Sequence, residues 1–263
     1  MRGITRDCVV EMFDRKIVHL FVAMTVIAAV ISLLVPRVDI EFHTTGNMDM
    51  GSMIDFFHKP VTIALSIFLS FMVFLAVLAT AGLIPNMLVK GRADFFLSKP
   101  LSRTGLLLHK ILGIWLVYGA MIALCGSIVY AVMVLVHGLF DWKVLYLFVL
   151  NLVSFFIWLS ITITVGIVSG SSAISIMSAF LVWVAQAILK FHDQINDFLA
   201  SKPLEYTIDT LYYIVPKTGE ISNLADTLAL GKPVESWVPL YSSLAFSAAL
   251  LVVAVIIFKR KNY

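Results

Sequence analysis

A stretch of 46 residues, from Val144 to Leu189, contains no charged side chain. As a single α-helix it would be about 69 Å long at 1.5 Å per residue, about twice the thickness of a bilayer's hydrocarbon core. The chain must therefore turn within this stretch, and Ser169-Gly-Ser-Ser-Ala173 contains the residues that best break a helix. The stretch predicts two membrane-spanning helices, 144–168 and 172–189, joined by a very short loop.

The composition of the whole chain also indicates a membrane protein. Hydrophobic residues make up 60% of its 263 residues and charged residues 13%, whereas soluble domains carry about 25% charged residues. Too few polar side chains remain to cover a surface that faces water, so we expect an all-α integral membrane protein whose single transmembrane domain covers residues 1–263. The apolar runs predict six spans, at 17–35, 61–84, 111–136, 144–168, 172–189 and 237–258.

The charged residues predict the orientation of these spans. An even number of spans places both termini on one side. If that side is the cytoplasm, it receives 12 of the 19 Lys and Arg residues but 4 of the 16 Asp and Glu residues. Lys and Arg accumulate in short cytoplasmic loops, so we expect both termini in the cytoplasm. A cleavable signal peptide is not expected in the first 36 residues, because the apolar region is too long and no small-residue cleavage site follows it.

Two segments outside the spans carry amphipathic patterns. Residues 1–16 predict an interfacial helix on the inner leaflet, and a solvated leader is the alternative. The external segment 190–236 contains apolar stripes at 195–199, 204–212 and 221–228, which predict short helices that cap the outer face.

The predicted spans contain no Asp, Glu, Lys or Arg. Ion-coupled carriers and proton pumps bind their driving ion through such groups, so secondary transport is disfavoured. The sequence also lacks a P-loop, an HExxH or CxxC motif, and a convincing nucleophile–histidine pair within the spans. We therefore expect no catalytic residue, no metal site and no cofactor in this chain, and it cannot hydrolyse ATP by itself.

Buried polar side chains in spans four and five are candidates for lining a path for an amphipathic substrate. The candidates are Asn151, Ser154, Thr162 and Gln186. Hydrogen bonding between helices is the alternative role for these groups, and it is the interpretation favoured for the hydroxyls.

The main cytoplasmic loop combines cations, a proline and several hydroxyls. Val89, Ala93 and Phe96 have the spacing of a short amphipathic helix, and Pro100 suits the first turn of a second helix. Lys99, Arg103 and Lys110 then fall on one side, which we expect to face lipid phosphates or an acidic partner. Simple anchoring by positive charge is the alternative, and it does not account for the helix-bend-helix layout.

The same loop resembles a known family. Leu97-Ser-Lys-Pro-Leu-Ser-Arg103, followed by Leu106-Leu-Leu-His-Lys110 and Gly113, is similar to a signature of ABC-2 type transporter permeases. Leu211-Tyr-Tyr-Ile-Val-Pro216 and the basic chain ending also resemble this family, most closely the six-span subgroup that includes the permease of nitrous-oxide reductase maturation. Two positions depart from the pattern: Asp94 stands where glutamate is usual, and His109 where glycine is common.

The resemblance implies a permease subunit that moves or extrudes a substrate across the cytoplasmic (inner) membrane of a prokaryote. Two copies would form a homodimer above two ABC ATPase subunits, and those subunits would bind ATP and Mg²⁺. Segment 86–103 would be the coupling loop that contacts the ATPase. The coupling residues would be Arg92, Asp94, Phe95, Phe96, Ser98, Lys99, Pro100, Ser102 and Arg103.

Further expectations follow from the resemblance. Spans two and five would line a central path, and 190–236 would form an outer gate or contact an external or periplasmic partner; no nucleic acid is expected. The alternative function is a non-transporting relay that passes ATP-driven motion to an external protein. A cavity that holds cargo would favour transport, and a tightly bound external protein would favour the relay.

Overall fold

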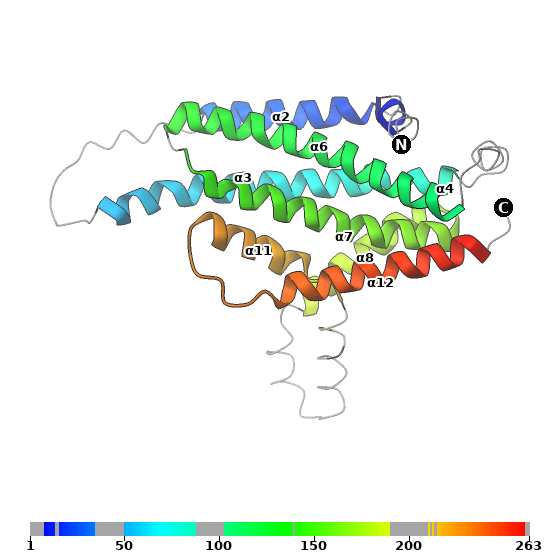
Figure 1. Cartoon of the computed structure of the whole chain (residues 1–263). Helices are drawn as coiled ribbons and strands as arrows, with labels where there is room; N and C mark the ends of the chain where they lie inside the picture. Colours follow the sequence, from blue (N-terminus) through cyan, green and yellow to red (C-terminus); the bar gives the residue numbers. More distant parts are fainter. Residues whose placement is uncertain are drawn as a thin grey trace.

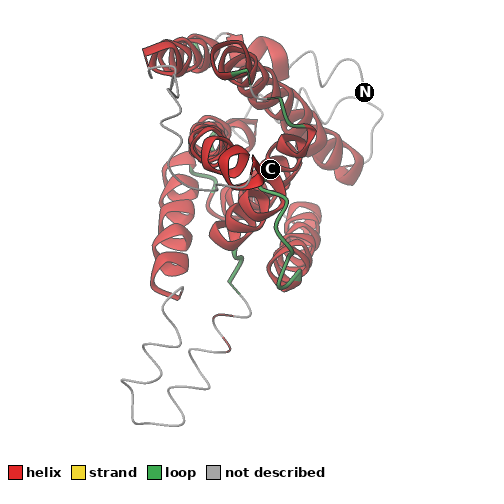
Figure 2. Ribbon diagram, turned by 90° about the vertical axis from the view of Figure 1, so that its left-hand side faces the viewer, coloured by secondary structure: helices red, strands yellow, loops and turns green. Residues whose placement is uncertain are grey.

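The computed structural model shows a bundle of helices that run side by side (Figure 1). It describes residues 8–13, 16–34, 50–87, 103–138, 140–189, 210, 212 and 215–260. Within these ranges there is no β-strand, as Figure 2 shows. The elements are α2 (Ile17–Leu34), α3 (Met50–Thr80), α4 (Leu83–Met87), α6 (Arg103–His137), η1 (Trp142–Val144), α7 (Leu145–Ser169), α8 (Ser172–Leu189), α11 (Thr218–Ala229) and α12 (Val238–Arg260).

Five helical stretches in the described ranges are long and apolar enough to cross a membrane. They are Lys59–Met87, Thr104–Val136, Trp142–Ser169, Ser172–Leu189 and Val238–Arg260. The prediction of an all-α protein with several membrane-spanning helices is therefore confirmed. The α2 helix is also apolar but shorter, about 27 Å long against a hydrocarbon core of about 30 Å. Residues 35–49, which follow it, lie outside the described ranges, so the first predicted span, 17–35, and with it the total of six spans, stays a prediction.

The break predicted at 169–173 is present in the structure. Helix α7 ends at Ser169, and α8 begins at Ser172. Gly170 between them has a φ of 67°, a left-handed conformation that glycine adopts without steric cost. The Gly170 N–H donates to the Gly166 carbonyl at 2.9 Å, and the Ser171 N–H donates to Ser169 Oγ at 3.2 Å. The glycine and the serine hydroxyl therefore end one helix so that the next can start.

The second span differs from the prediction at its end, which the sequence placed at Pro85. Helix α3 ends at Thr80, and the short helix α4 runs through Pro85. Proline is tolerated here because the N–H groups in the first turn of a helix have no intrahelical partner. A Cβ atom added to Gly166 would lie 3.0 Å from Pro85 Cγ, so α4 packs closely against α7.

The third span also begins earlier than predicted. Helix α6 starts at Arg103 rather than at residue 111, so Lys110 lies within it. Lys110 is buried, and its Nζ lies 3.4 Å from Oε2 of Glu11 in the short helix at residues 8–13. The expectation that Lys110 faces lipid phosphates or a partner is therefore wrong, and the candidate span Thr104–Val136 does contain a cation. An acid from the same chain compensates its charge, which makes the burial tolerable.

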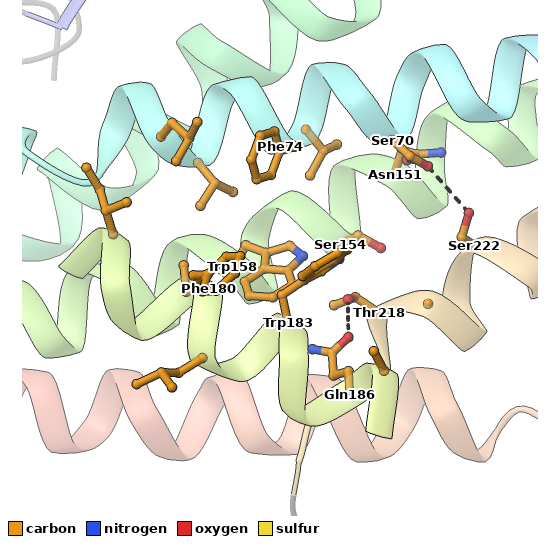
Figure 3. Close-up of a pocket in the computed structure, with 18 of the residues that line it drawn as sticks. Ser70, Phe74, Asn151, Ser154, Trp158, Phe180, Trp183, Gln186, Thr218 and Ser222 are labelled. Carbon is orange, nitrogen blue, oxygen red and sulfur yellow. Dashed lines mark hydrogen bonds between the residues drawn. The ribbon is translucent and has the colours of Figure 1, made fainter. Parts of the chain in front are cut away.

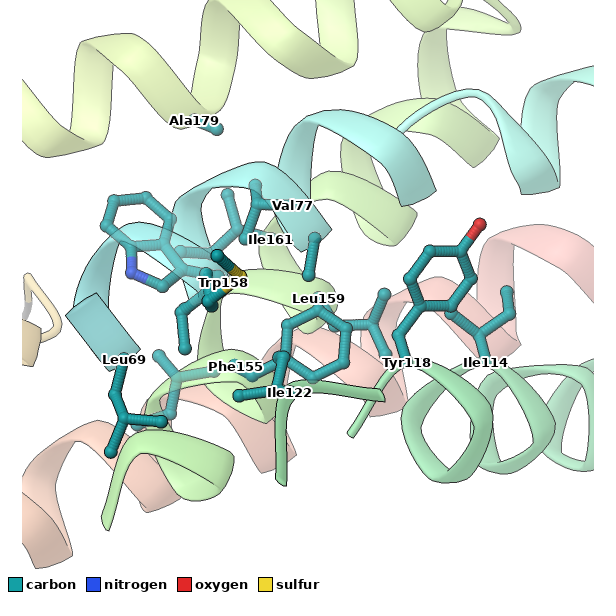
Figure 4. Close-up of a cluster of buried hydrophobic side chains, with 14 of the residues drawn as sticks. Leu69, Val77, Ile114, Tyr118, Ile122, Phe155, Trp158, Leu159, Ile161 and Ala179 are labelled. Carbon is teal, nitrogen blue, oxygen red and sulfur yellow. The ribbon is translucent and has the colours of Figure 1, made fainter. Parts of the chain in front are cut away.

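Helix α7 lies at the centre of the bundle, where it packs against α3, α8, α11 and α12. Figure 4 shows Phe155 and Leu159 of α7 among Leu69 of α3 and Tyr118 of α6, and all four side chains are buried. A helix that is apolar on every side is expected in such a position.

The apolar stripe at 221–228 forms α11, as predicted. Ile221, Leu224 and Ala225 are buried, and the helix packs on α3, α7 and α12. Figure 1 shows α11 beside the bundle, away from the end at which α2 begins, α6 begins and α12 ends. The stripe at 195–199 and nearly all of the stripe at 204–212 lie outside the described residues.

Candidate functional site

A cavity of about 880 Å³ lies between α3, α7, α8 and α11 (Figure 3). Helices α3 and α8 each pack on α7, so α7 forms the floor and the other two form the walls, while α11 covers one end. The lining residues are Ser70, Val73, Phe74, Val77, Leu78, Asn151, Ser154, Trp158, Ile176, Met177, Ala179, Phe180, Leu181, Trp183, Gln186, Ala187, Thr218, Gly219, Ser222 and Asn223.

Hydrogen-bonding groups from three helices meet at the α11 end of this cavity. Ser70 Oγ of α3 lies 3.4 Å from Ser222 Oγ of α11 and 3.5 Å from Asn151 Oδ1 of α7. The Asn151 Nδ2 group donates to the Leu147 carbonyl at 2.9 Å. These contacts hold the Asn151 amide and the two hydroxyls at one end of the cavity, as Figure 3 shows.

Gln186 of α8 adds a further polar group to the same end. Its Oε1 accepts a hydrogen bond from Thr218 Oγ1 of α11 at 2.6 Å. Its Nε2 is buried and has no hydrogen-bond partner among the residues that the structure describes. Buried amide donors are normally paired, so this N–H₂ group is an unsatisfied donor next to the cavity.

The other end of the cavity is apolar and aromatic. Trp158 forms part of the floor, and Phe74 and Phe180 stand on opposite walls (Figure 3). The exposed fraction is 50% for Phe74 and 58% for Phe180, so this end is open between α3 and α8. The ring of Trp183 lies 6.0 Å from that of Phe180, centroid to centroid.

The described residues that line the cavity carry no formal charge. None of its lining residues is Asp, Glu, Lys, Arg or His. A charged ligand inside it would lose hydration without meeting an opposite charge, which is costly in an apolar environment. The lining therefore suits a neutral molecule with one hydrogen-bonding end and one apolar end.

Three of the four residues predicted to line a substrate path lie at this cavity. Asn151, Ser154 and Gln186 are part of its lining. Thr162 is not: it is buried, and its Oγ1 donates to the carbonyls of Trp158 and Leu159 in its own helix. The favoured role of this hydroxyl, bonding between helices, is therefore wrong, because a threonine in a helix reaches the carbonyls of its own preceding turn. Whether a substrate passes the other three residues stays a prediction.

The sequence reasoning missed most of the cavity wall. Ser70, Thr218 and Ser222 supply hydroxyls from α3 and α11, and Phe74 and Trp183 supply aromatic surface. Ser66 and Ser70 are four residues apart in the second span, a spacing that places both on one helix face and was the available signal. The aromatic residues gave no signal, since periodicity cannot show which side of an all-apolar helix faces a cavity.

A second polar cluster lies at the start of α11. Tyr212 Oη donates to Glu220 Oε1 at 2.9 Å, and Lys217 Nζ lies 3.6 Å from the centroid of the Tyr212 ring. The Lys217 N–H donates to Ser243 Oγ of α12 at 2.8 Å. Burial lowers the pKa of Lys217, and the nearby Glu220 carboxylate acts in the opposite direction. These contacts fix the start of α11 against α12.

The predicted coupling residues mostly fall outside the described ranges. These are Arg92, Asp94, Phe95, Phe96, Ser98, Lys99, Pro100 and Ser102. Arg103 is the first residue of α6. In the described parts of the chain, no group of three or more His, Cys, Asp or Glu side chains is arranged to hold a metal ion.

Comparison of the sequence with known protein families gives no match, and comparison with curated proteins gives none either.

Proposed function

We propose that this chain is the membrane-spanning permease subunit of an ABC-2 type transporter, energised by a separate ATPase. The observation that carries the proposal is the segment Leu97–Gly113, whose sequence resembles the family signature. Its described part, from Arg103 onward, begins α6 at the end of the bundle where α2 also begins and α12 ends (Figure 1). A loop between two spans at that end is well placed to meet a cytoplasmic subunit.

The cavity supports transport over the alternative of a mechanical relay. Its volume of about 880 Å³ lies within the range of about 300–1,000 Å³ of cavities that hold small molecules. A relay needs packed helices but has no use for a cavity lined by hydrogen-bonding and aromatic side chains. Two copies of the chain would face each other across the open side between α3 and α8, which is the dimer expected for a half-transporter.

The packing of α4 suggests how motion of the coupling loop would reach the cavity. Helix α4, which immediately precedes that loop, packs against both α7 and α8. Gly166 lies where these helices meet, because an added Cβ would be 3.0 Å from both Pro85 Cγ and Ser175 Oγ. A push on the loop would move α4 against the start of α8, and α8 would turn about Gly170. This movement would change the gap between α3 and α8.

The test of the proposal is capture of an ATPase through the coupling loop. The full chain is purified from native membranes as wild type, Phe95→Ala, Phe96→Ala and, as a matched control, Lys99→Ala. An aromatic anchor carries about 2 kcal/mol of binding, roughly 30-fold in affinity, whereas a charge at the rim carries much less. We expect a P-loop ATPase and ATP hydrolysis to copurify with wild type and Lys99→Ala, and to be lost with at least one phenylalanine variant.

The proposal fails if no ATPase copurifies with the wild-type chain. It also fails if both phenylalanine variants retain the ATPase and its activity at wild-type levels, since the loop would then be only a charged membrane anchor.

A further inference from the structure

We infer that the cavity takes an uncharged amphipathic molecule that lies between α3 and α8. Its polar head lies at the α11 end, beside Asn151 and Gln186, and its apolar part lies against Phe74, Trp158 and Phe180. This inference rests on the proposed function, because it names the substrate class of the proposed permease.

The lack of charge in the lining disfavours ionic head groups. Among the described residues, the cavity wall holds no ionisable side chain, so a phosphate or carboxylate head would be desolvated without a compensating cation. Hydroxyl, ester and amide groups avoid this cost because hydrogen bonds alone can satisfy them.

The unsatisfied donor indicates which kind of neutral head fits. Gln186 Oε1 accepts from Thr218 at 2.6 Å, and the Nε2 of the same amide is buried without a partner among the described residues. A small turn of this side chain towards the cavity would pair Nε2 with a head that presents an acceptor oxygen. A hydroxyl or carbonyl oxygen meets this requirement.

The exposed side chains at the apolar end indicate where the apolar part of the molecule lies. Phe74 on α3 and Phe180 on α8 are 50% and 58% exposed, and Met177 on α8 is 64% exposed. Phe74 and Phe180 border the open side of the cavity between α3 and α8 (Figure 3). In the proposed dimer this side faces the second copy, so the apolar part would lie between the two chains.

Photolabelling of the full chain in phosphatidylcholine nanodiscs tests the inference. The probe is a monoacylglycerol with a diazirine in its acyl chain. The matched control probe is the lysophosphatidic acid with the same chain, which differs only by its phosphate. We expect saturable labelling of α3 and α8 peptides by the neutral probe, competed by unlabelled monoacylglycerol. The anionic probe should give no saturable labelling.

Variants locate the head group. Gln186→Met keeps the length of the side chain but removes the donor, and it should weaken labelling by the neutral probe at least tenfold. Thr162→Val is the matched control, because Thr162 bonds within its own helix and should leave labelling unchanged. If Gln186→Met does not fold, Phe180→Ala at the exposed mouth should reduce labelling several-fold.

Three results would overturn the inference. The first is non-saturable labelling that is as strong on α12 as on α3 and α8. The second is saturable labelling by the anionic probe, and the third is full labelling of the folded Gln186→Met variant. Because binding of the probe needs no ATPase, saturable labelling without a captured ATPase would contradict the proposed function alone. A captured ATPase without saturable labelling would contradict the substrate class alone.

Discussion

Helices α7 and α8 come from one charge-free stretch, yet they have different surroundings in the fold. Within the most apolar 18-residue stretch of each span, 61% of the residues are buried in the span that contains α7, but only 11% are buried in α8. Composition predicts that a helix avoids water, but it does not show whether protein or lipid surrounds it. The comparison indicates that α7 is the fixed core, whereas α8 is an outer wall with apolar surface left for another occupant.

The side chains explain this difference. Helix α7 contacts α3, α6, α8, α11 and α12, and its buried hydroxyls bond to nearby backbone carbonyls. The α8 helix packs mainly on α7, with Ser175 and Ala179 as its buried residues. Such small residues let two helices approach closely. The larger side chains of α8 point away from that contact and remain exposed.

The largest expected effect separates the two helices directly. Phe155 of α7 is fully buried, whereas Phe180 of α8 is 58% exposed. Phe155→Ala should lower the free energy of unfolding by about 3 kcal/mol, because lipid cannot fill the cavity left inside the protein. Phe180→Ala should change it by less than about 0.5 kcal/mol. Unfolding by SDS in mixed micelles measures both values. Equal losses would show that α8 is packed as tightly as α7.

A second pair of variants compares close packing at the centre with backbone conformation at the break. A Cβ on Gly126 of α6 would lie 2.6 Å from Leu69 Cδ2 and 2.7 Å from Phe148 Cε1, so Gly126→Ala should cost about 2 kcal/mol through overpacking. Gly170 has open space around it but a φ of +67°, and Gly170→Ala should cost about 1 kcal/mol. The same unfolding titration measures both. A larger loss at Gly170 would place the stricter constraint at the α7–α8 break.

The smallest expected effect concerns α11, which covers the cavity. Burial raises the pKa of Asp226, although a hydrogen bond with Ser66 acts in the opposite direction. Because the folded protein then holds this proton more tightly than the unfolded chain, stability should fall as pH rises from the ordinary value of 3.8 through the raised pKa. Asp226→Asn should remove that fall and be the more stable form near neutral pH. Melting temperatures measured at several pH values would show this, and an unchanged pH profile would contradict it.

Much of the architecture was predictable because strong local signals specify it. The lack of charge in 144–189 and the Ser-Gly-Ser-Ser segment gave both helices and the break between them. The position of Lys110 was not predictable, because its burial depends on Glu11, which lies 99 residues earlier in the chain. The cavity was predictable only through its amides and Ser154. Its aromatic wall depends on how α3 and α8 are rotated about their axes against α7. This rotation cannot be predicted from the sequence of a helix that is apolar on every side.

We propose that the exposed face of α8 meets a second copy of the chain across the cavity. Single cysteines test it in a background in which Cys8 and Cys125 are replaced. Phe180 of α8 and Val252 of α12 are matched in exposure, at 58% and 59%. In native membranes, oxidation should cross-link Phe180→Cys into a dimer of two permease chains and leave Val252→Cys monomeric. Dimers from Val252→Cys alone, or equal yields from both positions, would contradict the claim.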